Sequence, residues 1–332
     1  MQELEKIAVL GGGSWATALV KILSENKADV RWWLRNPDDV HHLQQYGHNP
    51  RYLSGVRFDL NFVHPSSNLE ETLKEADWVI LAVPAAFVQE ALAGLPADGF
   101  QGKTLVSAVK GMIPKENLLI TDFLEQHFGV PADRQCVIAG PCHAEEVALE
   151  KQSYLTIGSH DLERAEKFCD LLRNRYVKAN PLDDIDGVEY CAVIKNIIAL
   201  ACGIAHGLNY GDNFQAVMVS NSLEEIEHFL DALMPLHRDL KGSAYLGDLL
   251  VTAYSQFSRN RTFGNMIGRG YTVKSAQVEM NMVAEGYYAV KSIYELNQKY
   301  KVEMPITTAV YNILYEQVSP GVEIDILKEK FR

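Results

Sequence analysis

The first 24 residues contain the feature that most limits the fold: an apolar run, three glycines and a helical stretch in direct succession. Residues 6–10 are mainly aliphatic, as in a buried strand, and residues 14–24 follow a helical pattern. Gly11 and Gly13 fit the first two positions of a dinucleotide-binding turn, and Ala16 stands in the third, which needs only a small residue. This succession predicts a Rossmann-like domain in which the helix N-terminus faces a pyrophosphate. A tight turn without a ligand is the alternative.

The first half of the chain alternates apolar runs with helical patterns. The runs that we predict to be strands are residues 6–10, 30–34, 77–83, 104–109, 135–139 and 154–158. Continuous apolar strands separated by helices are typical of a parallel sheet that is covered on both faces. We therefore expect an α/β fold with a doubly wound, mostly parallel sheet.

The second half is expected to be all-α. The predicted helices are residues 188–206, 214–231, 243–257, 284–300 and 305–317. Residues 180–187 contain Pro, Gly and three acidic side chains, and we interpret them as the linker. The sequence thus predicts a dinucleotide-binding domain at residues 1–187 and a helical substrate-binding domain at residues 188–332.

Net charge and cysteine usage exclude several classes of protein. The chain has 332 residues with 31 Lys and Arg against 43 Asp and Glu, a net charge of −12, which argues against nucleic-acid binding. Its five cysteines form no CxxC pair, so we expect reduced thiols in a cytoplasmic protein and no metal site. The longest apolar helical pattern is too short and too interrupted to predict stable membrane insertion. An anionic ligand would need a local cluster of basic residues.

Lys195 lies in the middle of an apolar helical stretch. The residues three and four positions away are Cys, Ala, Ile and Ala, none of which can pair with an ammonium group. Burial moves the pKa of a lysine toward neutrality, and buried lysines usually have a charged partner, for which Asp248 is the candidate. The pattern predicts a proton donor for a carbonyl substrate, with a lysine that reaches the surface as the alternative.

Other residues are candidates for contacts with a dinucleotide or an anion. Arg35 stands near the position where an acidic residue would favour NAD, so we predict that NADP(H) is accepted; stacking on adenine or exposure to solvent is the alternative. Lys110 and Gly140 follow strand ends, where open α/β sheets bind ligands, although either could belong to a simple turn. Arg259 offers a planar fork for phosphate, although residues 258–261 could equally be a solvated helix start.

Eight short motifs resemble, in their order, those of one family. They are GGGSWATAL at 11–19, KG at 110–111, GP…AEEVA at 140–148, VEYCAVIKNIIALACGIAHGL at 188–208, LGDL at 246–249, SRNRTFG at 258–264, VAEGY at 283–287 and VEMPI at 302–306. The chain resembles the NAD(P)-dependent glycerol-3-phosphate dehydrogenases of bacterial type over nearly its whole length. The resemblance implies reversible hydride transfer from NADPH or NADH to dihydroxyacetone phosphate, which gives sn-glycerol 3-phosphate for glycerophospholipid synthesis.

The resemblance also implies a role for each matching residue. Lys195 would be catalytic, as proton donor in reduction and proton acceptor in oxidation. The residues implied in binding the small phosphorylated three-carbon substrate are Lys110, Gly140, Cys142, Lys195, Asn196, Asp248, Thr252, Ser258, Arg259 and Asn260. The residues implied in binding NADP or NAD are Gly11, Gly13, Ser14, Trp15, Arg35, Lys110, Ala144, Arg259, Val283 and Glu285. The oligomeric state is open, with a homodimer as one possibility.

Three positions depart from the family pattern. Cys142 and His143 stand where a hydroxyl residue and Phe are usual, and a thiol is a weaker hydrogen-bonding group than a hydroxyl. Asn221 stands where a basic residue is usual.

Two other functions are compatible with the sequence. One is another NADP-dependent two-domain reductase, acting on a β-hydroxy acid or on ketopantoate. The other is a non-catalytic NADP(H)-sensing module, which would need neither Lys195 nor Arg259.

Overall fold

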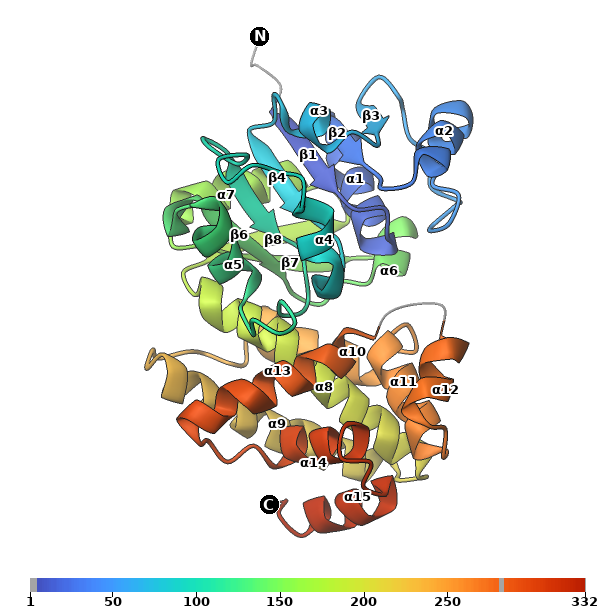
Figure 1. Ribbon diagram of the computed structural model, residues 1–332, viewed down its shortest axis with the longest axis vertical. Helices are drawn as coiled ribbons and strands as arrows, with labels where there is room; N and C mark the ends of the chain where they lie inside the picture. Colours follow the sequence, from blue (N-terminus) through green and yellow to red (C-terminus); the bar gives the residue numbers. More distant parts are fainter. Residues whose placement is uncertain (1–4, 281–283, 332) are drawn as a thin grey trace. The chain divides into compact units, whose positions relative to one another are not determined.

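The computed structural model describes residues 5–280 and 284–331, which divide into two units (Figure 1). The sheet unit contains the described residues up to Val109 together with Ile120–Asp186, and the helical unit contains Lys110–Leu119 and the described residues from Gly187 onward. The segment Lys110–Leu119 therefore groups with the helical unit, whereas the sequence interpretation left it within residues 1–187.

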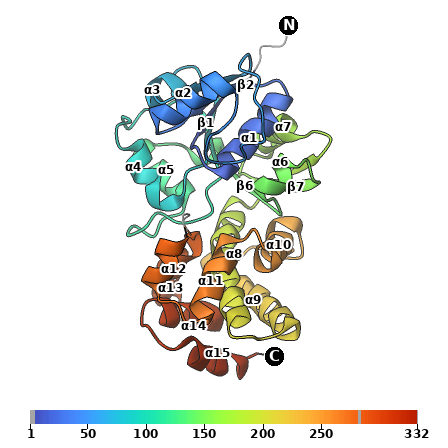
Figure 2. The same cartoon turned by 90° about the vertical axis from the view of Figure 1, so that its right-hand side faces the viewer.

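The sheet unit is a doubly wound α/β structure, as predicted. Its described residues form eight strands in the order β3-β2-β1-β4-β5-β6-β7-β8, and all neighbouring pairs are parallel except β6 with β7. Figure 2 shows α1, α6 and α7 on one face of this sheet and α4 and α5 on the other. The strands are β1 (Lys6–Leu10), β2 (Asp29–Trp33), β3 (Val63–Ser66), β4 (Trp78–Leu81), β5 (Thr104–Ser107), β6 (Gln135–Ala139), β7 (Ser153–Gly158) and β8 (Val177–Leu182).

Helices and short helical turns connect these strands. The α-helices are α1 (Ser14–Glu25), α2 (Pro37–Tyr46), α3 (Leu69–Leu73), α4 (Val88–Leu92), α5 (Ile120–Phe128), α6 (Ala144–Ala148) and α7 (Leu162–Leu172). The 3₁₀ turns are η1 (Ala85–Phe87) and η2 (Ala132–Arg134). Because helices cover both faces, β4, β5 and β6 are buried along their whole length, which explains their continuous apolar sequences.

Two strands escaped the sequence prediction, and both lie at an edge of the sheet. β3 contains Pro65 and β8 contains Pro181, and proline lacks the N–H group that an interior strand must donate to its neighbour. Residues 180–187, interpreted as the linker, contain the end of β8 and the start of the next helix at Ile185, and the two units divide within them, between Asp186 and Gly187.

The helical unit is built around α8, with α9, α11 and α13 packed around it (Figures 1 and 2). Its elements are α8 (Ile185–Gly207), α9 (Asp212–Leu233), the π-helical turn η3 (Ser243–Gly247), α10 (Asp248–Tyr254), α11 (Arg259–Gly268), α12 (Val273–Glu279), α13 (Glu285–Tyr300), α14 (Pro305–Leu314) and α15 (Pro320–Lys328). The helix predicted over residues 243–257 is present as a continuous helical stretch from Ser243 to Tyr254, but its first five residues form the π-helical turn. Helices α11, α12 and α15 were not predicted.

Within the described residues, α8 is the single helix that is long and apolar enough to cross a membrane. However, 94% of its most apolar window is buried inside the protein. A helix that is apolar on all sides is expected at the centre of a folded unit, and α8 has this position.

Four glycines allow α8 and α11 to cross with their backbones in contact. A Cβ on Gly264 would lie 2.2 Å from the carbonyl oxygen of Leu200, and one on Gly203 would lie 2.2 Å from that of Arg261. Gly207 and Gly268 are equally close to the opposite backbone, at 2.5 and 2.3 Å. No side chain fits into this crossing, which therefore fixes the start of α11 against α8.

We predict that Gly264→Ala destabilises the protein by about 1–3 kcal/mol, because the added methyl group forces two backbones apart. Urea unfolding followed by circular dichroism measures the change. Gly94→Ala is the matched control, since a Cβ there would meet no atom within 4 Å. Equal stability of Gly264→Ala and the wild type would contradict the close crossing.

Candidate active site

The glycine turn joins β1 to α1 in the sheet unit. Gly11 has a φ of +132°, and a Cβ there would lie 2.5 Å from the carbonyl oxygen of Ala82, so the position requires glycine. Gly13 is the N-cap of α1, no side chain caps this helix, and a Cβ on Gly13 would meet no atom within 4 Å. Ala16, in the third position of the motif, is fully buried. Open space beside Gly13, at the N-terminus of a 12-residue helix, suits a pyrophosphate, so the turn fits a dinucleotide.

Asn49 supports this turn and was missed in the sequence. Its Nδ2 donates to the carbonyl oxygen of Gly12 at 3.0 Å and to Oγ1 of Thr17 at 2.9 Å. Its Oδ1 accepts from the backbone N–H groups of Arg51 and Tyr52. Both partners in the turn lie far away in the sequence, so no local motif identifies this residue.

Arg35 lies two residues after β2 and has an exposed side chain. Its Nη1 is 3.1 Å from Oε1 of Glu90 on α4, and the two side chains are 70% and 65% exposed. The position is compatible with a contact to a dinucleotide, and the guanidinium already has an acidic neighbour.

The remaining predicted residues of the sheet unit are mostly buried. Gly140 has a φ of +108°, and a Cβ there would lie 2.5 Å from the carbonyl oxygen of Tyr154, so the close approach of β7 is sufficient to require this glycine. Ser14, Cys142 and Ala144 are buried, and Trp15 is half-buried.

Lys195, on α8, forms a buried ion pair with Asp248, the first residue of α10. The two side chains are only 3% and 2% exposed, so the alternative of a lysine that reaches the surface is wrong and the expected partner is confirmed. The π-helical turn η3 ends immediately before Asp248, and such irregular turns are frequent at functional sites.

Burial lowers the pKa of Lys195 to about 8. The carboxylate of Asp248 acts in the opposite direction, and the nearby ammonium group of Lys110 lowers the pKa further. Lys195 can therefore gain and lose a proton near neutral pH, which a general acid–base catalyst requires.

Two asparagine amides connect four segments of the helical unit. Nδ2 of Asn196 donates to the carbonyl oxygens of Lys110 at 2.7 Å and Ala192 at 3.1 Å. Oδ1 of Asn196 accepts from Nδ2 of Asn260 at 2.8 Å, and Oδ1 of Asn260 accepts from the N–H group of Gly286 at 2.9 Å. Both N–H donors of Asn196 are used in these contacts, whereas Asn260 keeps one further N–H for another acceptor. We call this chain of contacts the amide relay.

The start of α11 carries three predicted substrate residues. Ser258 is the N-cap, and its Oγ accepts from the N–H group of Arg261 at 3.3 Å. Arg259 is half-buried, whereas Ser258 and Asn260 are 5% and 7% exposed. A merely solvated helix start is therefore wrong for these two residues. Thr252 is buried on α10 and donates from Oγ1 to the carbonyl oxygen of Asp248 at 2.7 Å.

The structure thus connects Lys110, Lys195, Asn196, Asp248 and Asn260 in the helical unit. Glu285 begins α13 directly before the relay residue Gly286, and Val283 lies outside the described residues.

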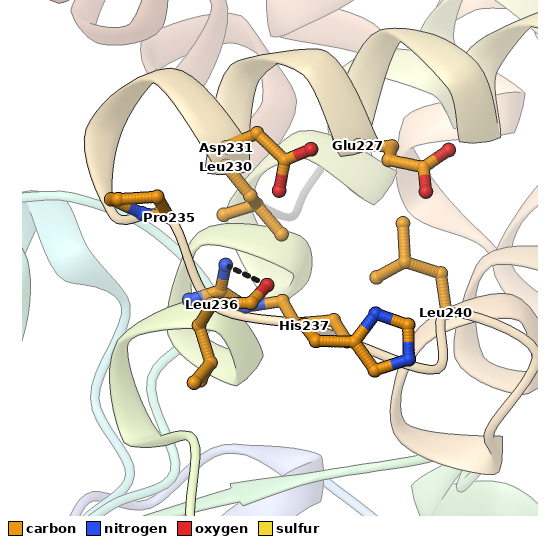
Figure 3. Close-up of a pocket in the computed structure, with 8 residues that line it drawn as sticks. Glu227, Leu230, Asp231, Pro235, Leu236, His237 and Leu240 are labelled. Carbon is orange, nitrogen blue, oxygen red and sulfur yellow. Dashed lines mark hydrogen bonds between the residues drawn. The ribbon is translucent and has the colours of Figure 1, made fainter.

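A separate pocket of about 320 Å³ lies near the end of α9 (Figure 3). None of the predicted site residues lines it. Its lining residues are Glu227, Leu230, Asp231, Pro235, Leu236, His237, Arg238 and Leu240.

A Rossmann-like sheet with a dinucleotide turn, joined to a helical unit with a buried lysine, defines the class of two-unit nicotinamide-dependent dehydrogenases. Residues 6–165 match the family model described as NAD-dependent glycerol-3-phosphate dehydrogenase N-terminus, and residues 184–325 match that of the C-terminus. The chain belongs to the NAD-dependent glycerol-3-phosphate dehydrogenase family.

Individual relatives agree with this membership. The chain is 35% identical over 332 residues to the glycerol-3-phosphate dehydrogenase [NAD(P)+] of Lysinibacillus sphaericus, with 99% of this chain and 97% of that protein covered. The crystal structure of glycerol-3-phosphate dehydrogenase from Coxiella burnetii is similar with a TM-score of 0.92 at 30% identity, covering 98% of this chain and 99% of that chain. A ketopantoate reductase from Ralstonia eutropha shares only the fold, with a TM-score of 0.59 at 15% identity over 96% of this chain and 99% of that chain.

Two substitutions near Lys195 should shift its pKa in opposite directions. Asp248→Asn should lower the pKa of Lys195 further, because it removes the carboxylate that favours the ammonium form. Lys110→Met should raise the pKa of Lys195, because it removes a like charge. NMR titration of protein labelled with ¹³C at lysine Cε measures both shifts, and Lys195→Arg assigns the signal. Unchanged titration midpoints in both variants would contradict the electrostatic coupling.

Proposed function

We propose that this protein reversibly reduces dihydroxyacetone phosphate to sn-glycerol 3-phosphate with NADPH or NADH. The observation that carries the proposal is the buried pair of Lys195 and Asp248 beside Lys110, in a chain with a dinucleotide turn. Reduction of a ketone needs a hydride and a proton, and the substrate phosphate needs cations. The family to which the chain belongs supports this choice of substrate.

The dinucleotide would be held at the turn of the sheet unit. The first N–H groups of α1 would receive its pyrophosphate beside Gly13, and Arg35 would contact its adenosine side. Ser14, Trp15, Lys110, Ala144, Arg259 and Glu285 complete the proposed cofactor contacts, together with Gly11 and Val283. The bound nicotinamide supplies or accepts the hydride, and the protein supplies orientation and charge.

Lys195 is the proposed proton donor to the substrate oxygen in reduction and the proton acceptor in oxidation. Asp248 stabilises its ammonium form, while burial and Lys110 make release of the proton easier. Negative charge that develops on the oxygen would be stabilised by an ammonium group shielded from water. Lys195 therefore combines the two roles of electrostatic stabilisation and proton transfer.

Arg259 and Asn260 are the proposed anchors of the substrate phosphate. A guanidinium can hold a phosphate through two parallel hydrogen bonds, and Asn260 retains one N–H donor beyond the amide relay. Fixing the remote phosphate in this way orients the ketone carbon for attack. The side chains of Ser258 and Thr252 already stabilise α11 and α10, so their contacts with substrate would add to a structural role.

Asn196 is better explained as a positioning residue than as a substrate ligand. Both of its N–H donors are used by carbonyl oxygens of the protein, and a phosphate needs donors. Its bond to the carbonyl oxygen of Lys110 would hold the segment that carries this lysine. Asn196 would thus determine where the second cation lies.

The proposed cellular role is to supply sn-glycerol 3-phosphate for glycerophospholipid synthesis in the cytoplasm. The five cysteines are free thiols, which is compatible with a reducing compartment. Assembly into a homodimer stays a prediction that analytical ultracentrifugation can test.

The two rival functions make different predictions. A ketopantoate or β-hydroxy-acid reductase would turn over those substrates and leave dihydroxyacetone phosphate unchanged. A sensing module would bind NADPH without turnover of any phosphorylated ketone. Membership in the glycerol-3-phosphate dehydrogenase family favours the proposed substrate over both rivals.

We predict that Lys195→Ala lowers kcat for dihydroxyacetone phosphate reduction by at least ~100-fold, the usual scale of general acid–base catalysis. Lys195→Arg should lose a similar factor while it keeps a cation beside Asp248, because arginine does not release its proton at neutral pH. NADPH absorbance measures turnover, and circular dichroism checks the fold. Lys167→Ala, at an exposed pair on α7, is the control. Near-normal kcat in Lys195→Arg would reject the proposed role.

A further inference from the structure

The ion pair of Arg35 and Glu90 crosses the carboxyl end of β1. Arg35 follows β2 and Glu90 lies on α4, which follows β4. In the sheet, β1 lies between β2 and β4, and all three strands run parallel, so their carboxyl ends meet at one edge. Because the glycine turn begins where β1 ends, the contact between the two side chains extends over the edge that carries this turn.

The pair is placed to respond to a charged ligand. Nη1 of Arg35 and Oε1 of Glu90 are 3.1 Å apart, and the side chains are 70% and 65% exposed. An exposed ion pair contributes little to stability and exchanges partners easily. The guanidinium of Arg35 has five N–H donors, and its contact with Glu90 uses one of them. A phosphate could therefore bind the remaining donors. The carboxylate would stay close to that phosphate and repel it.

We propose that Glu90 determines the preference between NAD(H) and NADP(H) by competing for Arg35 with the 2′-phosphate of NADP(H). The proposal rests on the dinucleotide site of the proposed function. NAD(H) has a ribose hydroxyl in place of this phosphate, so Glu90 has no added negative charge to repel when NAD(H) binds. Glu90 thus reduces the advantage that Arg35 gives to NADP(H), and the chain accepts both cofactors.

The size of the effect follows from the exposure of the pair. Solvent weakens both the attraction between Arg35 and Glu90 and the repulsion between Glu90 and a phosphate. We therefore expect a change in NADPH affinity of about three- to tenfold when the charge of Glu90 is removed. The change should decrease as salt is added, because the groups are screened.

The decisive experiment measures dinucleotide binding to the purified full-length protein by the fluorescence of NADPH and NADH. Glu90→Gln should tighten NADPH binding by about three- to tenfold and change NADH binding by less than about twofold. Measured against Arg35→Met alone, the further change Glu90→Gln should tighten NADPH binding by a clearly smaller factor than it does beside Arg35, because only direct repulsion of the phosphate is then relieved. Glu163→Gln is the control for charge, since Glu163 is exposed and pairs with Lys167 on α7.

Each outcome of this experiment decides the proposal. Equal changes for NADPH and NADH, no change for either, or a gain of undiminished size without Arg35 would overturn it. Because binding is measured without turnover, a selective gain for NADPH supports the role of Glu90 even if dihydroxyacetone phosphate is not reduced. A wild-type protein that binds neither dinucleotide would overturn this inference and the proposed function together.

Discussion

The buried pair of Lys195 and Asp248 is the interaction on which the proposed chemistry depends. Removing two charges from water is costly, and their mutual attraction compensates only when the geometry is fixed. Lys195 lies on a buried stretch of α8 and Asp248 at the buried start of α10, so packed helices hold both charges. Packing in the helical unit is therefore what makes a lysine with a pKa of about 8 possible. Without it, water would enter and the amine would behave as an ordinary surface lysine.

Other buried polar groups in the helical unit are likewise tolerated only because they have partners. The amides of Asn196 and Asn260 are tolerated because their hydrogen bonds connect them to backbone groups and to each other. The amide relay requires each of its members, because the loss of one side chain leaves the groups that it contacted buried without a hydrogen bond. The relay therefore couples the segment of Lys110 to α8, α11 and α13 more strictly than apolar packing would.

Local sequence patterns predicted the parts of this structure that depend on neighbouring residues. The buried strands have continuous apolar runs, and Gly11, Gly13 and Lys195 stand out from their own surroundings. The edge strands were missed because proline and polar residues are acceptable only there, and position in a sheet is not visible in a run of four to six residues. Asn49 and Glu225 were missed for another reason. Their partners lie far away in the chain: Glu225, for example, caps α14 by accepting from the N–H groups of Ile306 and Thr307.

The distribution of charge explains how an acidic protein can recognise anionic ligands. The net charge of −12 repels anions at long range, but salt screens this repulsion beyond about 10 Å. At short range, Lys110, Lys195 and Arg259 belong to segments that the amide relay connects, and Asp248 pairs with Lys195. Three basic residues are thus brought to connected segments of the helical unit. In the proposed function, recognition of the phosphate depends on these residues, so their removal should matter far more than a change in total charge.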